Sequence, residues 1–211
     1  MTVSSWPGFF ISLEGIDGAG KSTQGAALAG ELSRSGRDVV TLRPSDTQLG
    51  DLVRGYLLQH HQVAIDPWTE ALLFIAGRVQ LLRERILPAL QAGAVVIADR
   101  YADSTLAYQG AGRGLGVEAV RAINEFATGG LAADRTLLLA IDAAAGRRRR
   151  GDRGEGADRL ERETDEFFTR IAAGYASLAA AQPGRIRTLD ATLAPAALLE
   201  AALVELADLL E

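Results

Sequence analysis

The sequence has no cysteine, a single lysine and no long uninterrupted apolar run. Without cysteine, neither a disulfide framework nor a thiolate metal site can form. No apolar run approaches the roughly 18 residues that a membrane span requires. The first eight residues lack a basic segment followed by an apolar one, so we expect no signal peptide. With a formal net charge of −5 and a pI of about 5.2, a nucleic-acid partner is disfavoured. These absences favour a soluble, cytoplasmic protein.

The order of apolar and helical segments predicts the fold class. Short apolar segments typical of buried strands cover 9–13, 39–42, 94–98, 136–141 and 186–189, and helical patterns cover 21–35, 47–59, 67–92, 163–181 and 194–210. Within 67–92, a stripe expected to face the core consists of Leu72, Ile75, Val79, Leu82 and Ile86. Strands that alternate with helices predict an α/β fold, a doubly wound five-stranded parallel sheet covered on both faces.

The length of 211 residues suits one compact domain, 1–211, with a small mobile lid. The lid is expected at the one low-complexity stretch, residues 146–157, which contains five arginines and four glycines. This stretch is too polar to pack in a core, so we expect it to be mobile.

The strongest motif is a phosphate-binding loop between the first strand and the first helix. Its residues are Gly15, Ile16, Asp17, Gly18, Ala19, Gly20, Lys21 and Ser22, which fit G-x-x-x-x-G-K-[ST], and Thr23 follows. The glycines let backbone N–H groups converge on phosphate oxygens at a helix N-terminus. Lys21 can reach the β- and γ-phosphates, and the Ser22 hydroxyl can bind Mg²⁺. The loop predicts a nucleoside triphosphate ligand and the P-loop NTPase type of fold.

The single lysine adds to this signal. Of the 22 basic residues, 21 are arginine, and the remaining one is Lys21 of the loop. An ammonium is a compact point charge, whereas a guanidinium is a broad planar fork. The sequence therefore keeps an ammonium at the position where a guanidinium would not serve.

Three classes of P-loop protein compete: small-molecule kinases, GTPase switches, and ATPase motors or partitioning proteins. A GTPase normally carries N-K-x-D, and a partitioning ATPase carries a second lysine, so the single Lys21 disfavours both. Motors usually end an apolar strand in Asp-Glu, whereas here Val95–Ala98 is followed by Asp99 and Arg100. That pair suits a carboxylate on the metal side and a guanidinium for an acceptor phosphate, which favours a kinase.

Four motifs in register resemble the bacterial thymidylate kinases over nearly the whole chain. They are Leu13–Gln24, Leu73–Arg78, Asp99–Tyr101 with Ser104–Thr105, and Asp158–Glu161. The resemblance implies Mg²⁺-dependent transfer of the ATP γ-phosphate to dTMP by a homodimer. Another nucleoside monophosphate kinase or deoxynucleoside kinase remains an alternative, and so does a non-catalytic nucleotide-binding switch. Deoxynucleoside kinases, however, usually lack the Asp17–Gly18 pair.

Such a reaction needs no general base. A phosphate monoester has a second pKa of about 6, so the acceptor is already largely a dianion. Catalysis then reduces to positioning two anions and cancelling their repulsion. His60 and His61 stand in an ordinary polar stretch and are expected at the surface.

Phe74 and Arg78 lie one helical turn apart, so both can face one ligand. The resemblance implies that the Phe74 ring stacks on thymine and that Arg78 donates to O4 of the base. Because arginine has no acceptor, it would reject the amino group of cytosine.

The resemblance assigns further residues to the acceptor nucleotide. Asp17 would approach the 3′-hydroxyl, and Arg100 would bind the acceptor phosphate. Ser104–Thr105 would contact the base edge, and Tyr108 would crowd the 2′-position. Arg54 is expected to be an additional phosphate ligand.

The donor side is expected to involve the lid, residues 146–161. Glycine at position 18 together with an arginine-rich lid matches the bacterial branch, whose catalytic cations come from that lid. Arg153 is expected to stabilise the transition state together with Lys21 and Arg100, and Arg149 to stack on adenine. Ser22 and Asp99 are the expected Mg²⁺ ligands.

Two positions depart from the family pattern. Residues 43–47 read Arg-Pro-Ser-Asp-Thr in place of Glu-Pro-Gly-Gly-Thr. Ala140 ends the fourth strand where the family often has aspartate, and Asp142 follows two places later.

Overall fold

The computed structural model describes residues 6–59, 64–151 and 158–210, with residues 150 and 151 described by their backbone alone. Within these ranges, parallel strands form a five-stranded sheet in the order β2-β3-β1-β4-β5. The strands are β1 (Phe10–Glu14), β2 (Val39–Leu42), β3 (Val95–Asp99), β4 (Arg135–Ala140) and β5 (Ile186–Asp190). The predicted α/β class and the five-stranded parallel sheet are confirmed, with each strand end within one residue of its expected place.

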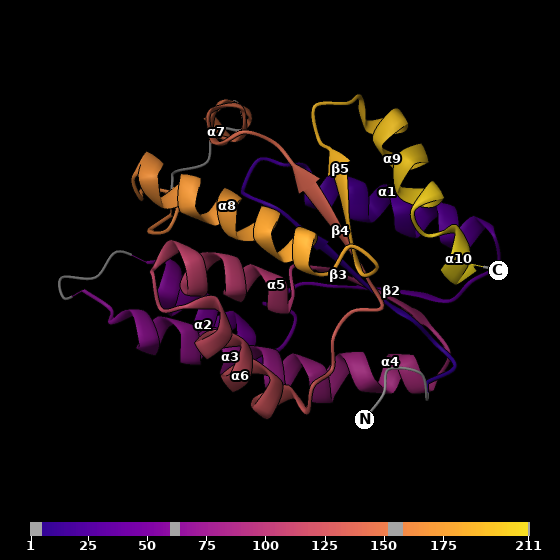
Figure 1. Ribbon diagram of the computed structural model, residues 1–211. Helices are drawn as coiled ribbons and strands as arrows, with labels where there is room; N and C mark the ends of the chain where they lie inside the picture. Colours follow the sequence, from indigo (N-terminus) through magenta and orange to yellow (C-terminus); the bar gives the residue numbers. More distant parts are fainter. Residues whose placement is uncertain (1–5, 60–63, 152–157, 211) are drawn as a thin grey trace.

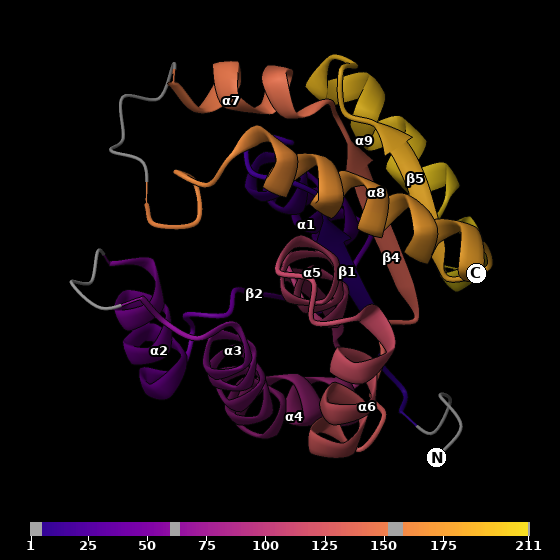
Figure 2. The same ribbon diagram turned by 60° about the vertical axis from the view of Figure 1, so that its left-hand side comes forward.

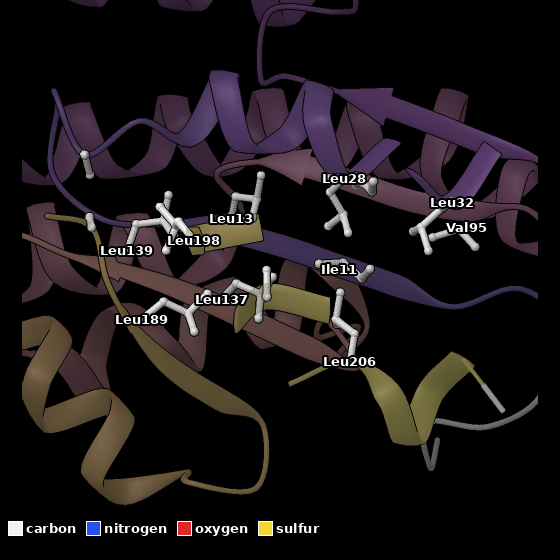
Figure 3. Close-up of a cluster of buried hydrophobic side chains, with 14 residues drawn as sticks. Ile11, Leu13, Leu28, Leu32, Val95, Leu137, Leu139, Leu189, Leu198 and Leu206 are labelled. Atoms are coloured by element: carbon white, nitrogen blue, oxygen red, sulfur yellow. The ribbon is translucent and has the colours of Figure 1, made fainter. Parts of the chain in front are cut away.

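Helices cover both faces of the sheet (Figures 1 and 2). One face carries α1 (Lys21–Arg34), α9 (Pro195–Val204) and α10 (Ala207–Leu210), and their apolar side chains meet the sheet in the cluster of Figure 3. The remaining elements are α2 (Gln48–Leu58), α3 (Pro67–Leu81), η1 (Leu82–Ile86), α4 (Leu87–Gln91), α5 (Ala102–Thr105), η2 (Leu106–Gly112), α6 (Val117–Thr128), α7 (Ala143–Gly151) and α8 (Asp165–Ala181). No helix among the described residues combines the length and apolarity needed to cross a membrane.

The two faces of the central strand β1 differ in chemistry. Ile11 and Leu13 point into the apolar cluster beneath α1 and α9 (Figure 3). The alternate positions Phe10, Ser12 and Glu14 point to the opposite face, and all three are buried. A hydroxyl and a carboxylate inside a central strand require hydrogen-bond partners, because an unpaired buried polar group is costly. Those partners lie at the site described below.

The predicted helix over 67–92 is present as the continuous run α3, η1 and α4. The stripe assigned to its core face is buried at Ile75, Leu82 and Ile86 and partly buried at Val79, but Leu72 is 49% exposed. That part of the expectation is wrong because Leu72 lies outside the buried face of α3, which is formed by Glu70, Ala71, Ile75, Gly77 and Leu81. A Cβ placed on Gly77 would lie 3.6 Å from the Cα of Gly50 in α2.

Three helical segments were not expected: α5 with η2, α6, and α7. The first six residues of 146–157 form the end of α7, where Gly146 is buried and Arg148 and Arg149 are exposed. The expected mobility of the stretch stays a prediction. The rest of that stretch, together with His60 and His61, lies outside the described residues.

Candidate active site

The loop Gly15–Ser22 has the expected strand before it and the expected helix after it. Its glycines at 15, 18 and 20 have φ values of 135°, 87° and 94°, a region that other residues rarely adopt. Lys21, the first residue of α1, is buried, and its Nζ donates to the carbonyls of Gly15 (3.1 Å) and Ile16 (2.9 Å). The ammonium thus lies folded back over the loop, where phosphates would bind.

Burial and the neighbouring Arg100 guanidinium lower the pKa of Lys21 from 10.5 to about 8. The carboxylates of Asp17, Asp99 and Glu14 act in the opposite direction. The ammonium therefore depends on nearby negative charge to stay protonated.

Two oxygen ligands meet beside the loop. The Ser22 hydroxyl donates to Oδ2 of Asp99 at 2.7 Å, and both side chains are partly or fully exposed. A hydroxyl and a carboxylate suit Mg²⁺, which prefers oxygen ligands and usually keeps several waters. The two predicted metal ligands are therefore adjacent.

Asp17, Arg100 and Tyr108 form a second cluster at the mouth of the loop. Nη2 of Arg100 lies 2.7 Å from Oδ1 of Asp17, and the Tyr108 hydroxyl donates to Oδ2 of Asp17 at 3.0 Å. Burial would raise the pKa of Asp17, but Arg100 and Lys21 hold it well below its usual range. Burial raises the pKa of Tyr108, so its hydroxyl stays a donor. The guanidinium of Arg100 is thus fixed by a carboxylate in front of a hollow.

That hollow is a cavity between the loop, α2, α3, α5 and η2. All eight predicted acceptor residues line it: Asp17, Arg54, Phe74, Arg78, Arg100, Ser104, Thr105 and Tyr108. They come from four separate stretches of the chain, at 17, 54, 74–78 and 100–108, and the fold brings them together. The cavity joins the P-loop to the other family motifs.

Arg78 is held in the cavity wall by several contacts. Its Nη1 donates to Oδ1 of Asn124 (2.7 Å), and its Nη2 donates to the carbonyl of Tyr101 (2.9 Å) and to Oγ1 of Thr105 (2.6 Å). The guanidinium also lies 5.4 Å from the centre of the Tyr101 ring. Three of its five N–H groups are engaged, which leaves donors for a ligand.

Asp142 directly precedes the arginine-rich helix α7, and its Oδ1 accepts from the backbone N of Ala145 (2.7 Å). Asp142, of uncertain role by sequence, thus caps this helix. Nη1 of Arg149 donates to the carbonyl of Ala191 at 2.8 Å, and Arg147 pairs with Asp165. The guanidinium of Arg149 therefore lies at the turn after β5, whereas Arg153 lies outside the described residues.

The motif Asp158–Glu161 is anchored to α2 and α3 through Arg159. Nε of Arg159 donates to the carbonyl of Leu57 at 2.7 Å, and its Nη2 pairs with the buried carboxylate of Glu70. The carboxylate of Glu70 also accepts hydrogen bonds from Nε of Arg113 and Nε2 of Gln109. The arginines lower the pKa of Glu70 against the effect of burial.

The loop 43–47, which departs from the family pattern, closes on itself. Oδ2 of Asp46 accepts from the backbone N of Arg43 (2.8 Å), and Oγ1 of Thr47 caps α2 by accepting from Gly50 N (3.0 Å). Pro44 lines the cavity. Ala140, the other departure, ends β4 and accepts from Ala191 N through its carbonyl.

Several residues that shape the site were not identified from the sequence. Glu14 and Tyr175 meet behind Ser104, and Asp103 forms a bidentate pair with Arg185. Glu14 left a signal, a charged residue ending an apolar strand. Asp103 and Arg185, 82 positions apart, left none.

Comparisons with known proteins agree on one family. The sequence model of the thymidylate kinase family matches residues 13–201. The chain is 46% identical over 185 residues to a thymidylate kinase of Alkalilimnicola ehrlichii, covering 87% of this chain and 85% of that protein. It is 48% identical over 186 residues to one of Deinococcus radiodurans, covering 88% and 89%. A crystal structure of thymidylate kinase from Ehrlichia chaffeensis superposes with a TM-score of 0.71 at 31% identity, covering 86% and 92%.

The lowered pKa of Lys21 predicts an alkaline limit for binding of the triphosphate. Above pH 8 or so the free protein loses the ammonium proton, so kcat/KM for the triphosphate should fall about tenfold per pH unit. The value for the phosphate acceptor, measured at saturating triphosphate, should lack this limit because bound phosphates keep Lys21 protonated. A kcat/KM for the triphosphate that stays level to pH 9.5 would contradict the assignment of Lys21.

Proposed function

The chain belongs to the thymidylate kinase family and is an ATP-dependent dTMP kinase, and on this premise we propose how its residues divide the reaction. The observation that carries the proposal is the single cavity in which the acceptor residues meet at the edge of the P-loop. One kinase domain over 1–211 would carry the reaction, with residues 146–161 as its lid.

In the proposed acceptor site, dTMP lies in this cavity with thymine against the ring of Phe74. Arg78 donates to O4 of thymine from a position fixed by Asn124 and Thr105. If cytosine enters, the same guanidinium faces the amino group of the base. Both groups are hydrogen-bond donors, so neither finds an acceptor. Base selection is thus a property of one pre-oriented guanidinium.

The acceptor phosphate binds Arg100, with Arg54 as a further ligand. Asp17 and Tyr108 hold Arg100 in the absence of substrate. Asp17 receives the 3′-hydroxyl, Tyr108 excludes a 2′-hydroxyl, and Ser104 and Thr105 complete the wall beside the base.

On the donor side, the loop N–H groups of residues 15–23 and the Lys21 ammonium bind the phosphates of ATP. Ser22 and Asp99 hold Mg²⁺, which neutralises phosphate charge when bound. Arg149 stacks on adenine, and Arg153 reaches the transferring phosphate from the lid. Lys21 and Arg100 then act on the two sides of the transferred group.

We also propose a cytoplasmic homodimer. Apolar side chains are exposed on one face, made by the neighbouring helices α2, α3 and α6 (Figure 2). They are Leu49, Leu52, Tyr56, Leu72 and Phe126. An apolar face of this kind is the usual mark of a protein interface.

The alternatives raised by the sequence, another nucleotide kinase or a non-catalytic switch, find no support in these relatives. ADP release over a panel of nucleoside monophosphates tests the assignment directly. Release that is independent of any acceptor would indicate a switch.

Substitution of Arg78 tests base selection. Arg78→Ala should lower kcat/KM for dTMP by roughly 10- to 100-fold, because one oriented donor is lost. The ratio of dTMP to dCMP turnover should narrow, since the group that rejects cytosine is also gone. Arg83→Ala, on the exposed side of the same helical run, is the matched control. An unchanged ratio in Arg78→Ala would remove Arg78 from the base site.

A bisubstrate analogue tests the lid. An analogue that joins adenosine and thymidine through phosphates should protect residues 146–157 from trypsin, and ATP alone should protect them only partly. The bound phosphates would draw the arginines inward and exclude water, which strengthens each ion pair. Arg153→Ala should lower kcat by about 10- to 100-fold, less than the ~10³-fold of a solitary arginine finger. Arg34→Ala, on the exposed side of α1, is the control. If the analogue does not change cleavage by trypsin and Arg153→Ala does not change kcat, the lid has no catalytic role.

Sedimentation tests the homodimer. Phe126, 91% exposed on α6, should be covered in the dimer, so Phe126→Asp should give a folded monomer. Val204 is also exposed, but it lies in α9 on the opposite face of the sheet. Val204→Asp adds the same charge there and should leave the dimer intact. Identical sedimentation of the two variants would place the interface elsewhere.

A further inference from the structure

Glu14 is a completely buried carboxylate at the last position of β1, directly before the P-loop. The described part of the chain supplies four donors to it. Oε1 accepts from Ser12 Oγ (3.1 Å) and from the backbone N of Tyr101 (2.7 Å). Oε2 accepts from Ser104 Oγ (2.5 Å) and Tyr175 OH (3.0 Å). A carboxylate offers about four lone-pair sites, so an ionised Glu14 is fully satisfied here.

Two of these donors, Tyr101 N and Ser104 Oγ, lie within four residues after Arg100. Among the described residues other than glycine, Arg100 alone has a positive φ, of 78°. A side chain makes this left-handed conformation unfavourable, so it persists only where the surroundings impose it. The backbone N of Arg100 is bonded to the carbonyl of Leu13 (3.0 Å), and the next backbone N, of Tyr101, is bonded to Glu14. The end of β1 therefore accepts hydrogen bonds from the backbone on both sides of the strained residue.

The same carboxylate also reaches the side chain of Arg100. Nη1 of Arg100 donates to Ser104 Oγ (3.0 Å), and that hydroxyl donates onward to Glu14. Backbone and guanidinium of Arg100 are thus tied to one buried group. Glu14 is not among the described side chains that line the cavity, so it can act on a substrate only through other residues.

We propose that Glu14 is the positioning residue that imposes the left-handed conformation of Arg100 and so aims its guanidinium at the acceptor phosphate. This role rests on the proposed function of Arg100 as the acceptor-phosphate ligand. It ties the acceptor site to the strand from which the P-loop starts, because Gly15 follows Glu14 directly. A misplacement of about 1 Å at such a group can cost on the order of 100-fold in rate.

The first test replaces Glu14 by an apolar side chain of similar length. Glu14→Met removes the acceptors of Tyr101 N and Ser104 together. We expect kcat/KM for dTMP to fall about 10- to 100-fold, while KM for ATP stays within about twofold, because the phosphate loop itself is untouched. A folded Glu14→Met enzyme with normal kcat/KM for dTMP would overturn the proposal, and so would equal losses toward both substrates.

Glu14→Gln keeps the length and one acceptor oxygen, so it should fold even if the apolar variant does not. Its amide oxygen can still accept from Tyr101 N, so the loss in kcat/KM for dTMP should be smaller, about 3- to 10-fold, and again confined to dTMP. The matched control is Asp134→Asn, because Oδ2 of Asp134 accepts from the backbone N of Phe10 (2.7 Å) at the opposite end of β1. It should leave kcat/KM for dTMP unchanged. An equal loss in both variants would mean that Glu14 acts only through general stability.

A double-mutant cycle separates this inference from the function on which it rests. In an Arg100→Ala background, Glu14→Gln should add less than about twofold to the loss in kcat/KM for dTMP. Full additivity would show that Glu14 acts by another route and would overturn the proposal. Normal dTMP use by Arg100→Ala itself would instead refute the assigned role of Arg100.

Discussion

The active site depends on how a buried ammonium, Lys21, and a half-buried guanidinium, Arg100, are kept side by side. Burial and the Arg100 guanidinium both lower the pKa of Lys21. An arginine, in contrast, stays protonated in such surroundings. The carboxylate of Asp17 lies against Arg100 and raises the pKa of Lys21, which keeps the ammonium charged at neutral pH in the free protein. Bound phosphates are negatively charged, so they replace Asp17 as the anionic partners of the two cations. The only lysine of the chain thus stands where a titratable, compact cation is required.

A second constraint is steric and joins the phosphate loop to the arginine-rich helix. A Cβ on Gly18 would lie 2.2 Å from the carbonyl oxygen of Gly146 in α7, and one on Gly146 would lie 2.8 Å from the carbonyl of Asp17. No side chain fits at either position while α7 rests on the loop. A cation at position 18 and an arginine helix packed against it therefore exclude each other. This contact explains why the glycine in the loop and the arginines of 147–150 occur together in one sequence.

Periodicity and motif spacing were sufficient to predict the sheet, the helices on both its faces and the P-loop, because each of these follows from local sequence. The stripe containing Leu72 failed because the buried face of α3 includes Glu70, Ala71 and Gly77 beside Ile75 and Leu81, and a polar or small residue gives no apolar signal. Helix α6 was hidden because Asn124 and Thr128 occupy buried positions that an apolar period would assign to hydrophobic residues. The family motifs predicted which residues line the cavity, but not what orients them. Contacts such as Asp103 with Arg185 join distant segments, and no local pattern announces them.

These constraints converge on the carboxyl end of β1. The carbonyl of Leu13 accepts from the backbone N of Arg100, and Glu14 accepts from Tyr101 N and from the Ser104 hydroxyl that binds the Arg100 guanidinium. Gly15 opens the loop that carries Lys21. Arg100 and Lys21, the proposed ligands of the acceptor and the donor phosphates, are therefore positioned by three consecutive residues: the last two of β1 and the first of the loop. β1 is paired on both sides, with β3 and β4. In phosphoryl transfer the protein contributes mainly position and charge, since the acceptor needs no deprotonation. A rigid strand end can fix the separation of the two phosphates in advance, and the proposed lid would then have only to add positive charge and exclude water.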